Sequence, residues 1–148
     1  MLIRDVASLE ELRQCCLISL QIYNKNSIVP VNEDKAWKSM KNRWYSKGYI
    51  KCIVINNKIA GWFCANKLSY SYSNATTFNL EILHHNQSNF TGVKIIRLVH
   101  NELIKYAILT KQKTVCSNSI LPTMDTFNRI LSKDGWQQNG CQMIYKIT

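Results

Sequence analysis

The spacing of apolar and polar residues changes several times along the chain, and these changes predict its helices and strands. Apolar side chains recur every three or four residues in some segments and occur in short β-branched and aromatic runs in others. The predicted helices cover residues 8–23, 32–48, 92–109 and 124–136. The predicted strands cover residues 1–6, 49–55, 58–68, 75–83 and 113–120, with one or two more within 137–148.

Local signals support the predicted boundaries. Ser8 and Glu11 have the spacing of a capping box ahead of the first apolar stripe. Asn56-Asn57 separates two β-prone runs, which predicts a tight hairpin, because asparagine tolerates a positive φ. Gly48 and Gly135 can end the second and fourth helices. The buried face of the third helix is predicted to carry the following residues: Val93, Ile96, Val99, Leu103 and Tyr106 or Ala107.

The resulting order is β-α-α-β-β-β-α-β-α-β, and it predicts a sheet with helices packed on it, of the α/β or α+β class. There are no repeats, no low-complexity linkers and no change in composition along the 148 residues. We therefore expect residues 1–148 to form a single domain.

The chain is strongly basic, with 19 Lys and Arg against 9 Asp and Glu, a net charge of +10. Such a charge favours an anionic partner, such as nucleic acid, a phosphorylated cofactor, a membrane surface or an acidic protein, although it can also serve solubility alone. The second helix interleaves basic and aromatic residues, a pattern compatible with nucleic-acid binding. At helical spacing, however, Trp37 and Trp44 share one face, which indicates a core stripe beside a solvated basic face.

The six cysteines form no C-x-x-C pair and no cluster with histidine at zinc spacing, so we expect no metal site. Most of them lie in apolar runs, which is typical of reduced core residues in a reducing compartment. No signal peptide or membrane-spanning apolar run is recognisable. We expect a cytoplasmic protein, or one that acts inside a larger particle.

Residues 80–103 begin as a strand, pass through the polar turn "NQSNFTG" and continue as a long helix. A strand that leads through a turn into a helix N-terminus can form an anion site. Together with "NNKIAGW", "LSKDGW" and "GCQMIYKIT" and the order of elements, this segment resembles the GCN5-related N-acetyltransferase (GNAT) family over essentially the whole chain. The resemblance implies a central mixed, mostly antiparallel sheet flanked by about four helices.

The resemblance also implies acetyl-CoA as the ligand, without a metal. Its pyrophosphate would lie at the backbone of Gln87, Ser88, Asn89, Phe90, Thr91 and Gly92, where the family pattern is Q/R-x-x-G-x-G/A. Its acyl-pantetheine arm would pair with the backbone of Ile82, Leu83 and His84. Phe90 replaces the first glycine of the family pattern and adds bulk beside the amides, so the loop could bind CoA in altered form or could have lost it.

Two further residue positions bear on catalysis. Leu131 stands where many family members have a tyrosine that protonates the leaving thiolate, so water or another residue would have to do so. Glu81 and His84 are the candidate general bases, with His85 beside them. Against these roles, a glutamate in a strand commonly faces solvent, and adjacent histidines at a strand end are commonly surface residues.

The sequence therefore predicts acyl transfer from CoA to an amine of a small molecule or protein acceptor by direct attack. The alternative is a catalytically degenerate protein of the same fold that binds a larger protein assembly, for example a phage virion component. A nucleic-acid-binding module is a third hypothesis, which steep salt dependence of binding would reveal.

Overall fold

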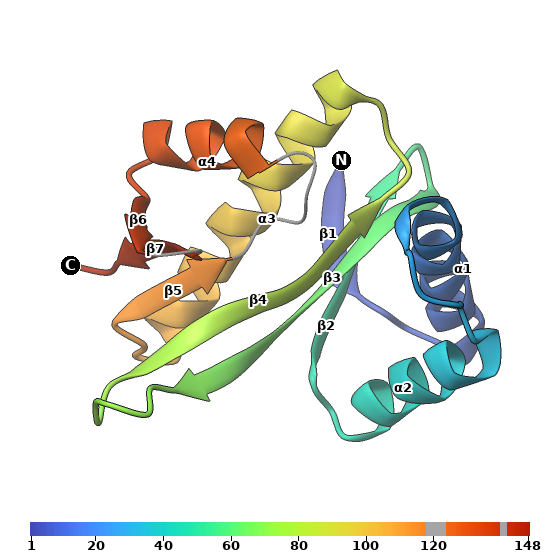
Figure 1. Ribbon diagram of the computed structural model, residues 1–148, viewed down its shortest axis with the longest axis horizontal. Helices are drawn as coiled ribbons and strands as arrows, with labels where there is room; N and C mark the ends of the chain where they lie inside the picture. The colour runs from blue at the N-terminus through green and yellow to red at the C-terminus, as the bar shows by residue number, and fades with distance from the viewer. Residues whose placement is uncertain (118–123, 140–141) are drawn as a thin grey trace. The chain divides into compact units, whose positions relative to one another are not determined.

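A computed structural model gives the structure of the protein, a mixed α/β fold (Figure 1). Its described residues form one seven-stranded sheet and four helices. The structure describes residues 1–117, 124–139 and 142–148. The strand order is β1-β2-β3-β4-β5-β7-β6. β4 and β5 pair in parallel, whereas the pairs β1–β2, β5–β7 and β6–β7 are antiparallel. The predicted fold class, a mostly antiparallel mixed sheet flanked by helices, is confirmed.

The elements follow the predicted order, and two separate strands close the chain. The helices are α1 (Leu9–Asn26), α2 (Glu33–Tyr45), α3 (Asn89–Leu109) and α4 (Met124–Lys133). The strands are β1 (Leu2–Asp5), β2 (Tyr49–Ile55), β3 (Lys58–Ser69), β4 (Thr76–His85), β5 (Thr114–Ser117), β6 (Gln137–Asn139) and β7 (Gln142–Lys146). The predicted turn residue Gly140 and the cysteine Cys141 lie outside the described residues.

Contacts within the chain define two compact units, so the prediction of a single domain stays a prediction. The first unit comprises Met1–Cys64 and Ile82–Ser88, and the second comprises Ala65–Glu81 and Asn89–Thr148. Strands β3 and β4 therefore contribute residues to both units. Each unit has its own buried side chains and is described separately below.

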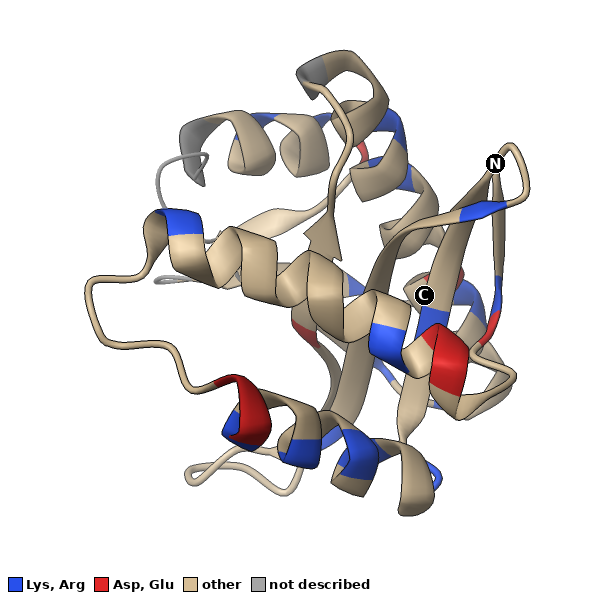
Figure 2. Ribbon diagram, turned by 90° about the vertical axis from the view of Figure 1, so that its right-hand side faces the viewer, with Lys and Arg blue, Asp and Glu red and all other residues tan. Residues whose placement is uncertain are grey.

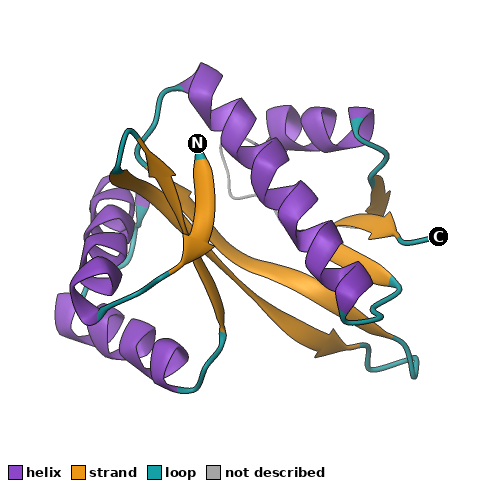
Figure 3. Ribbon diagram, turned by 180° about the vertical axis from the view of Figure 1, so that it is seen from behind, coloured by secondary structure: helices purple, strands orange, loops and turns teal. Residues whose placement is uncertain are grey.

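In the first unit, α1 and α2 cover one side of β1, β2 and the start of β3 (Figures 1 and 3). One apolar cluster joins the two helices to these strands. Its fully or nearly fully buried members are Val6, Leu12, Cys15, Cys16, Leu20, Met40, Ile50, Cys52, Trp62 and Cys64. Trp37 and Trp44 pack at the edge of this cluster, and Arg13 and Lys41 lie over the Trp37 ring. The prediction of a core stripe on α2 is therefore confirmed.

Only one of the two hydrogen bonds of the capping box predicted at the start of α1 is formed. The Ser8 hydroxyl accepts a hydrogen bond from the Glu11 backbone N–H at 3.2 Å. The Glu11 carboxylate does not return to the Ser8 backbone, as a capping box would require. It accepts from the Ala7 backbone N–H at 2.8 Å and receives both terminal nitrogens of Arg4 at 2.7 and 2.9 Å. This bidentate pair lowers the pKa of Glu11 to about 2.

The end of α2 differs from the prediction by one residue. Lys47, rather than Gly48, has a left-handed backbone, with φ of 56°. The Lys47 and Gly48 backbone N–H groups donate to the carbonyls of Trp44 and Arg43 at 3.1 Å each, which is the Schellman pattern. Asn56 and Asn57, with φ of 50° and 62°, form the predicted β2–β3 turn.

In the second unit, α3 lies against β5 and α4, and α4 lies against β6 (Figure 3). The helix α3 starts at Asn89, three residues earlier than predicted, and its buried face is rotated from the expected one. Ile95, Val99, Leu103 and Ala107 are fully buried, whereas Val93 and Ile96 are only half-buried. The helix α4 ends at Lys133, and Gly135 follows it with a left-handed backbone, φ 92°, as the stop predicted near Gly135 requires. The Trp136 N–H donates to the Leu131 carbonyl at 3.1 Å.

The second unit also buries a histidine. His100 on α3 is 1% exposed; its Nδ1 lies 2.6 Å from the Ile96 carbonyl oxygen and its Nε2 lies 2.8 Å from Ser117 Oγ. Because a carbonyl only accepts, Nδ1 carries the proton and Nε2 accepts from the serine hydroxyl. Burial lowers the pKa of His100 to about 4.

The cysteines and the charged residues of α2 lie in different environments. The five cysteines in the described residues, Cys15, Cys16, Cys52, Cys64 and Cys116, are free thiols and buried. In Figure 2, α2 is the helix at the lower edge of the view, and its basic residues are spread along it. The acidic residues Glu33 and Asp34 lie in the first turn of α2. No helix within the described ranges is long and apolar enough to cross a membrane.

Candidate active site

The candidate catalytic residues lie in one strand. β4 runs to His85, two residues past the predicted end, so His84 and His85 are strand residues. Glu81 is exposed, as a strand glutamate that faces solvent would be, but His84 is only 4% exposed. The interpretation of both histidines as surface residues is therefore wrong for His84, because the strand continues and alternates its side chains between two environments.

His84 is held in the first unit by a chain of hydrogen bonds from two other elements. Trp62 Nε1 on β3 donates to Ser19 Oγ on α1 at 2.7 Å, and Ser19 Oγ lies 2.7 Å from His84 Nδ1. The rings of Tyr23 and Trp62 meet the imidazole edge to face, with centroids 5.2 and 6.1 Å away. Ser19 is itself 3% exposed, so the chain of donors and acceptors is closed off from bulk water.

The geometry determines which nitrogen of His84 carries the proton. An indole N–H can only donate, so Ser19 Oγ must accept from Trp62. Trp62 and His84 are the hydrogen-bond partners of the Ser19 side chain among the described residues, so its hydroxyl proton points to Nδ1. Neutral His84 then carries its own proton on Nε2. Burial lowers the pKa of His84 to about 4, so this neutral form is the one present near pH 7.

Gly61 allows β4 to approach β3 closely beside His84. A Cβ atom at Gly61 would lie 2.6 Å from the His84 carbonyl oxygen and 2.9 Å from His85 Cβ. The Asn86 N–H also donates to the Ala60 carbonyl at 3.0 Å, which continues the contact past the end of the strand. The glycine of "NNKIAGW", one of the sequence signals of the family resemblance, is thus required by backbone packing.

The predicted pyrophosphate segment is divided between a short turn and a helix. Within the turn, the Gln87 N–H donates to His85 Nδ1 at 3.2 Å and Gln87 Nε2 donates to Asn86 Oδ1 at 2.6 Å. Because α3 starts at Asn89, Phe90, Thr91 and Gly92 form its first turn instead of a loop. The first four N–H groups of a helix have no partner within the helix and can receive an anion.

Phe90 does not fill the space beside these amides. Its side chain is 74% exposed, and Lys94 Nζ lies 4.7 Å from the ring centroid on the following turn of α3. Residues 86–92 contain no acidic side chain, and Gly92 is buried. The residues present therefore fit a bound pyrophosphate on the grounds of charge and of backbone donors that have no partner within the helix.

The structure describes the β4 side of the predicted site for the acyl-pantetheine arm, but only part of its β5 side. The parallel pairing of β4 with β5 runs from Phe78↔Val115 to Leu80↔Ser117. Ile82, Leu83 and His84 follow on β4, but residues 118–123, which follow β5, lie outside the described ones. The assignment of these three backbones to the acyl arm stays a prediction.

Leu131 is fully buried in α4, where its carbonyl caps the end of the helix. A leucine has no proton to donate, so Leu131 serves packing and cannot act as a general acid. His, Cys, Asp and Glu side chains form no group able to hold a metal ion within residues 1–117, 124–139 and 142–148.

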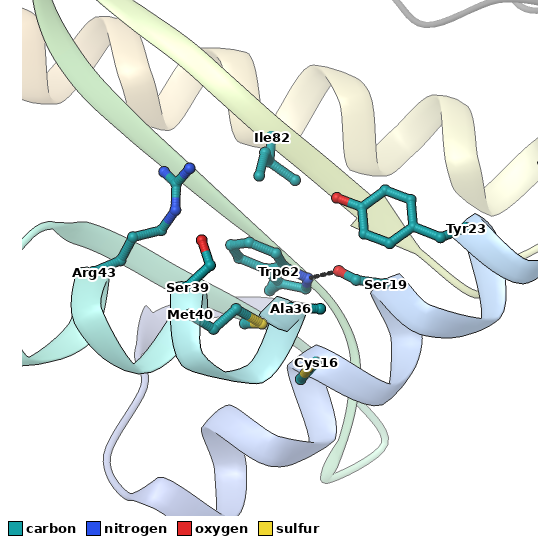
Figure 4. A pocket seen from close by; sticks show the side chains of 9 residues that line it. All are labelled: Cys16, Ser19, Tyr23, Ala36, Ser39, Met40, Arg43, Trp62 and Ile82. Carbon is teal, nitrogen blue, oxygen red and sulfur yellow. Dashed lines mark hydrogen bonds between the residues drawn. The ribbon is translucent and has the colours of Figure 1, made fainter. Parts of the chain in front are cut away.

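A small cavity of about 70 Å³ lies beside the Ser19–Trp62 hydrogen bond (Figure 4). Its lining comes from α1, α2, β3 and β4: Cys16, Ser19, Tyr23, Ala36, Ser39, Met40, Arg43, Trp62 and Ile82. Of its polar members, the sequence pattern indicated only Arg43 as functional, as one of the basic residues of the second helix that are compatible with nucleic-acid binding. The one further signal was Ser19, a hydroxyl within an otherwise apolar helical stripe.

Comparisons with solved structures agree with this architecture. An N-acetyltransferase from Staphylococcus aureus Mu50 is similar over 99% of this chain and 98% of its own, with a TM-score of 0.74 and 14% identity. The aminoglycoside 6'-N-acetyltransferase from Enterococcus faecium is similar over 100% and 98%, with a TM-score of 0.72 and 14% identity. The chain has the GNAT acetyltransferase fold.

The yncA acetyltransferase from Salmonella typhimurium, solved with its cofactor acetyl-CoA, shares this GNAT fold. It matches 100% of this chain and 94% of its own, with a TM-score of 0.67 and 14% identity. No protein-family model and no curated protein sequence matches the chain. At these identities the likeness shows the fold, and the activity has to be argued from the residues.

Proposed function

We propose that the protein is an acetyl-CoA-dependent N-acetyltransferase that acts on an amine of a small molecule or a protein. The observation that carries this proposal is the GNAT fold over the whole chain, with a helix that starts directly after the β4 turn and whose first N–H groups have no partner within the helix. Acetyl-CoA, when bound, supplies the acetyl group as a thioester. The α3 amides of residues 89–92, together with Gln87 and Ser88, would hold its pyrophosphate.

Of the two candidate general bases, His84 is disfavoured by its hydrogen bonds. A base must present a lone pair to the ammonium group of the acceptor. In His84 the Nδ1 lone pair is occupied by the Ser19 hydroxyl and Nε2 carries a proton, so neither nitrogen is ready to accept one. Glu81, whose side chain is exposed, is the remaining candidate, since a carboxylate can act as a general base directly or through a water. The amine nitrogen then forms the new C–N bond as the C–S bond breaks.

The leaving thiolate has to be protonated by water or by the released proton. Leu131 cannot donate, and it is buried in the core of the second unit. A thiol with an ordinary pKa near 8.5 leaves acceptably as the thiolate at neutral pH, so the missing acid lowers the rate without preventing transfer.

Acetyl-CoA binding is the first test. Ligand at 100 times its dissociation constant should stabilise the folded state by about 2.7 kcal/mol. For a chain of this length the unfolding midpoint should rise by roughly 5–10 °C.

A charge variant locates the ligand. Ser88→Asp places a negative charge directly before α3, where it stabilises the helix but repels a pyrophosphate. Its acetyl-CoA affinity should fall about tenfold or more, since one lost charge contact corresponds to about 1.4 kcal/mol. Ser8→Asp makes the same change at the start of α1 and should leave the affinity unchanged.

No stabilisation at millimolar acetyl-CoA would reject the enzyme hypothesis. The alternative, a catalytically degenerate protein of this fold in a larger assembly such as a phage virion, would then be preferred, and it predicts co-purification with that assembly. If Ser88→Asp and Ser8→Asp behave alike, CoA binds somewhere other than the start of α3.

A further inference from the structure

The buried part of the cavity lining in the first unit consists mainly of carbon and sulfur. Cys16, Met40 and Trp62 are at most 5% exposed. Ser19, which is also buried, is already hydrogen-bonded to Trp62 and His84. These side chains offer a polar ligand atom no strong partner, so a group that touches them has to be made of carbon.

The more exposed part of the lining carries hydrogen-bond donors. Ser39 and Arg43 also line an open hollow on the surface of α2, so they lie at the mouth of the cavity. Figure 4 shows the Tyr23 and Ser39 hydroxyls extending toward the space over the Trp62 ring, with Ile82 on the opposite side. Neither hydroxyl has a hydrogen-bond partner among the described residues. Burial raises the pKa of Tyr23, so its hydroxyl keeps its proton and can donate to a carbonyl oxygen.

Neither a cation nor an anion suits this lining. It contains no Asp or Glu, and the positive charge of Arg43 would repel an ammonium group. The guanidinium is itself already engaged, since Arg43 Nη1 donates to Cys64 Sγ at 3.4 Å. The faces of the Tyr23 and Trp62 rings carry negative partial charge, which repels a carboxylate. A ligand group inside the cavity therefore has to be uncharged.

The volume of the cavity limits the length of this group. A cavity of about 70 Å³ is roughly half of the ~150 Å³ that accommodates benzene, so it holds a tail of about three carbon atoms. A straight tail of this length, joined to a carbonyl at the mouth, is a butyryl group. A longer tail would have to leave the cavity through its mouth.

We infer that the Tyr23–Ser39–Arg43 cavity binds a short uncharged acyl group, with the alkyl tail inside and the carbonyl oxygen at the two hydroxyls. The source of this group rests on the proposed function: it is the acyl group carried by CoA. Ile82 supports this source, because it lines the cavity and its backbone belongs to the β4 segment predicted for the acyl arm. Acetyl-CoA then still binds, but butyryl-CoA binds more tightly.

A titration without CoA tests the cavity by itself. Acetamide and butyramide share an amide carbonyl and differ by two methylene groups, and each buried methylene raises the affinity about fourfold. The indole N–H signal of Trp62, followed by ¹H–¹⁵N NMR, should therefore saturate with butyramide at roughly fifteenfold higher affinity than with acetamide. Butyrate and n-butylammonium should bind more weakly than butyramide. Equal affinities of the two amides, no saturation with butyramide, or tighter binding of either ion would overturn the inference.

Two variants should change the preferred tail length in opposite directions. Ala36→Leu partly fills the cavity and should reduce the affinity for butyramide to that for acetamide. Ile82→Ala enlarges the cavity, and only in this variant should hexanamide bind more tightly than butyramide. Lys38→Leu on α2 and Ile59→Ala on β3 make matched changes outside the cavity lining and should leave the order of the amides unchanged. An order that neither Ala36→Leu nor Ile82→Ala alters would show that the amides bind outside the cavity.

The affinities of CoA thioesters test the source of the acyl group. Butyryl-CoA should bind roughly fifteenfold more tightly than acetyl-CoA to the parent protein, and Ala36→Leu should abolish this difference. Equal affinities of the two thioesters, with butyramide still bound in the cavity, would overturn the assignment to CoA and place the acyl group on the acceptor. If neither thioester binds, the proposed function and this assignment fail together, whereas the butyramide titration still decides the cavity.

Discussion

The hydrogen bonds of Ser19 permit a quantitative prediction for Ser19→Ala. The substitution removes the acceptor of Trp62 Nε1–H and the partner of His84 Nδ1, each at 2.7 Å in a buried environment. A buried polar group left without a partner costs about 1–3 kcal/mol, so two such groups cost about 2–6 kcal/mol. Alanine favours the α1 helix by about 0.5 kcal/mol over serine. We therefore expect a net loss of about 2–5 kcal/mol in the free energy of unfolding.

Urea denaturation, followed by far-UV circular dichroism and Trp fluorescence, measures this loss. Ser39→Ala is the matched control, because it makes the same change on the neighbouring helix at an exposed serine without a hydrogen bond in the described residues. The control should remain within about 0.5 kcal/mol of the parent protein. NMR of the parent should find His84 neutral with its proton on Nε2.

A Ser19→Ala variant as stable as Ser39→Ala would refute the reasoning. It would mean that Trp62 and His84 find other partners or water when Ser19 is removed. A proton on Nδ1 of His84 would refute the assignment of the donor chain even if stability fell as expected. His84 would then again be a candidate for the general base.

Three further outcomes follow from other parts of the structure. Burial lowers the pKa of His84 and of His100 from 6.5 to about 4, so the unfolded state binds more protons between these values. The free energy of unfolding should therefore be highest above pH 6.5 and should fall toward pH 4, by at most about 3 kcal/mol for each histidine. Urea midpoints that do not change over this range would contradict the burial of these rings. Lys47→Gly should raise stability by about 1 kcal/mol, because φ of 56° strains a side chain there, whereas Lys38→Gly inside α2 should lower it by a similar amount. Gly61→Ala should lower the free energy of unfolding by about 1–3 kcal/mol or more, because the new Cβ would lie 2.6 Å from the His84 carbonyl oxygen. A variant as stable as the parent would show that β3 and β4 can separate there.

Much of the candidate site could be predicted from the sequence because it is continuous in the chain. Glu81, the backbone of residues 82–84 and residues 87–92 belong to one strand–turn–helix segment, whose elements are defined by local pattern. The Ser19–Trp62–His84 chain and the Tyr23–Ser39–Arg43 cavity could not be predicted. Their residues come from three or four elements, and only packing brings those elements together.

The amino-acid sequence by itself determined the order of strands and helices, because hydrophobic periodicity, the Ser8 cap, the Asn56-Asn57 turn and the Gly135 stop act over a few residues. Only the tertiary structure decided the length of β4, the rotation of the buried face of α3 and the environment of His84. These depend on neighbours distant in the chain: β4 continues past its predicted end because Gly61 gives it room, and His84 is neutral because α1 and β3 enclose it. Local propensity is a property of a short segment, whereas burial and hydrogen bonding are properties of the assembled fold.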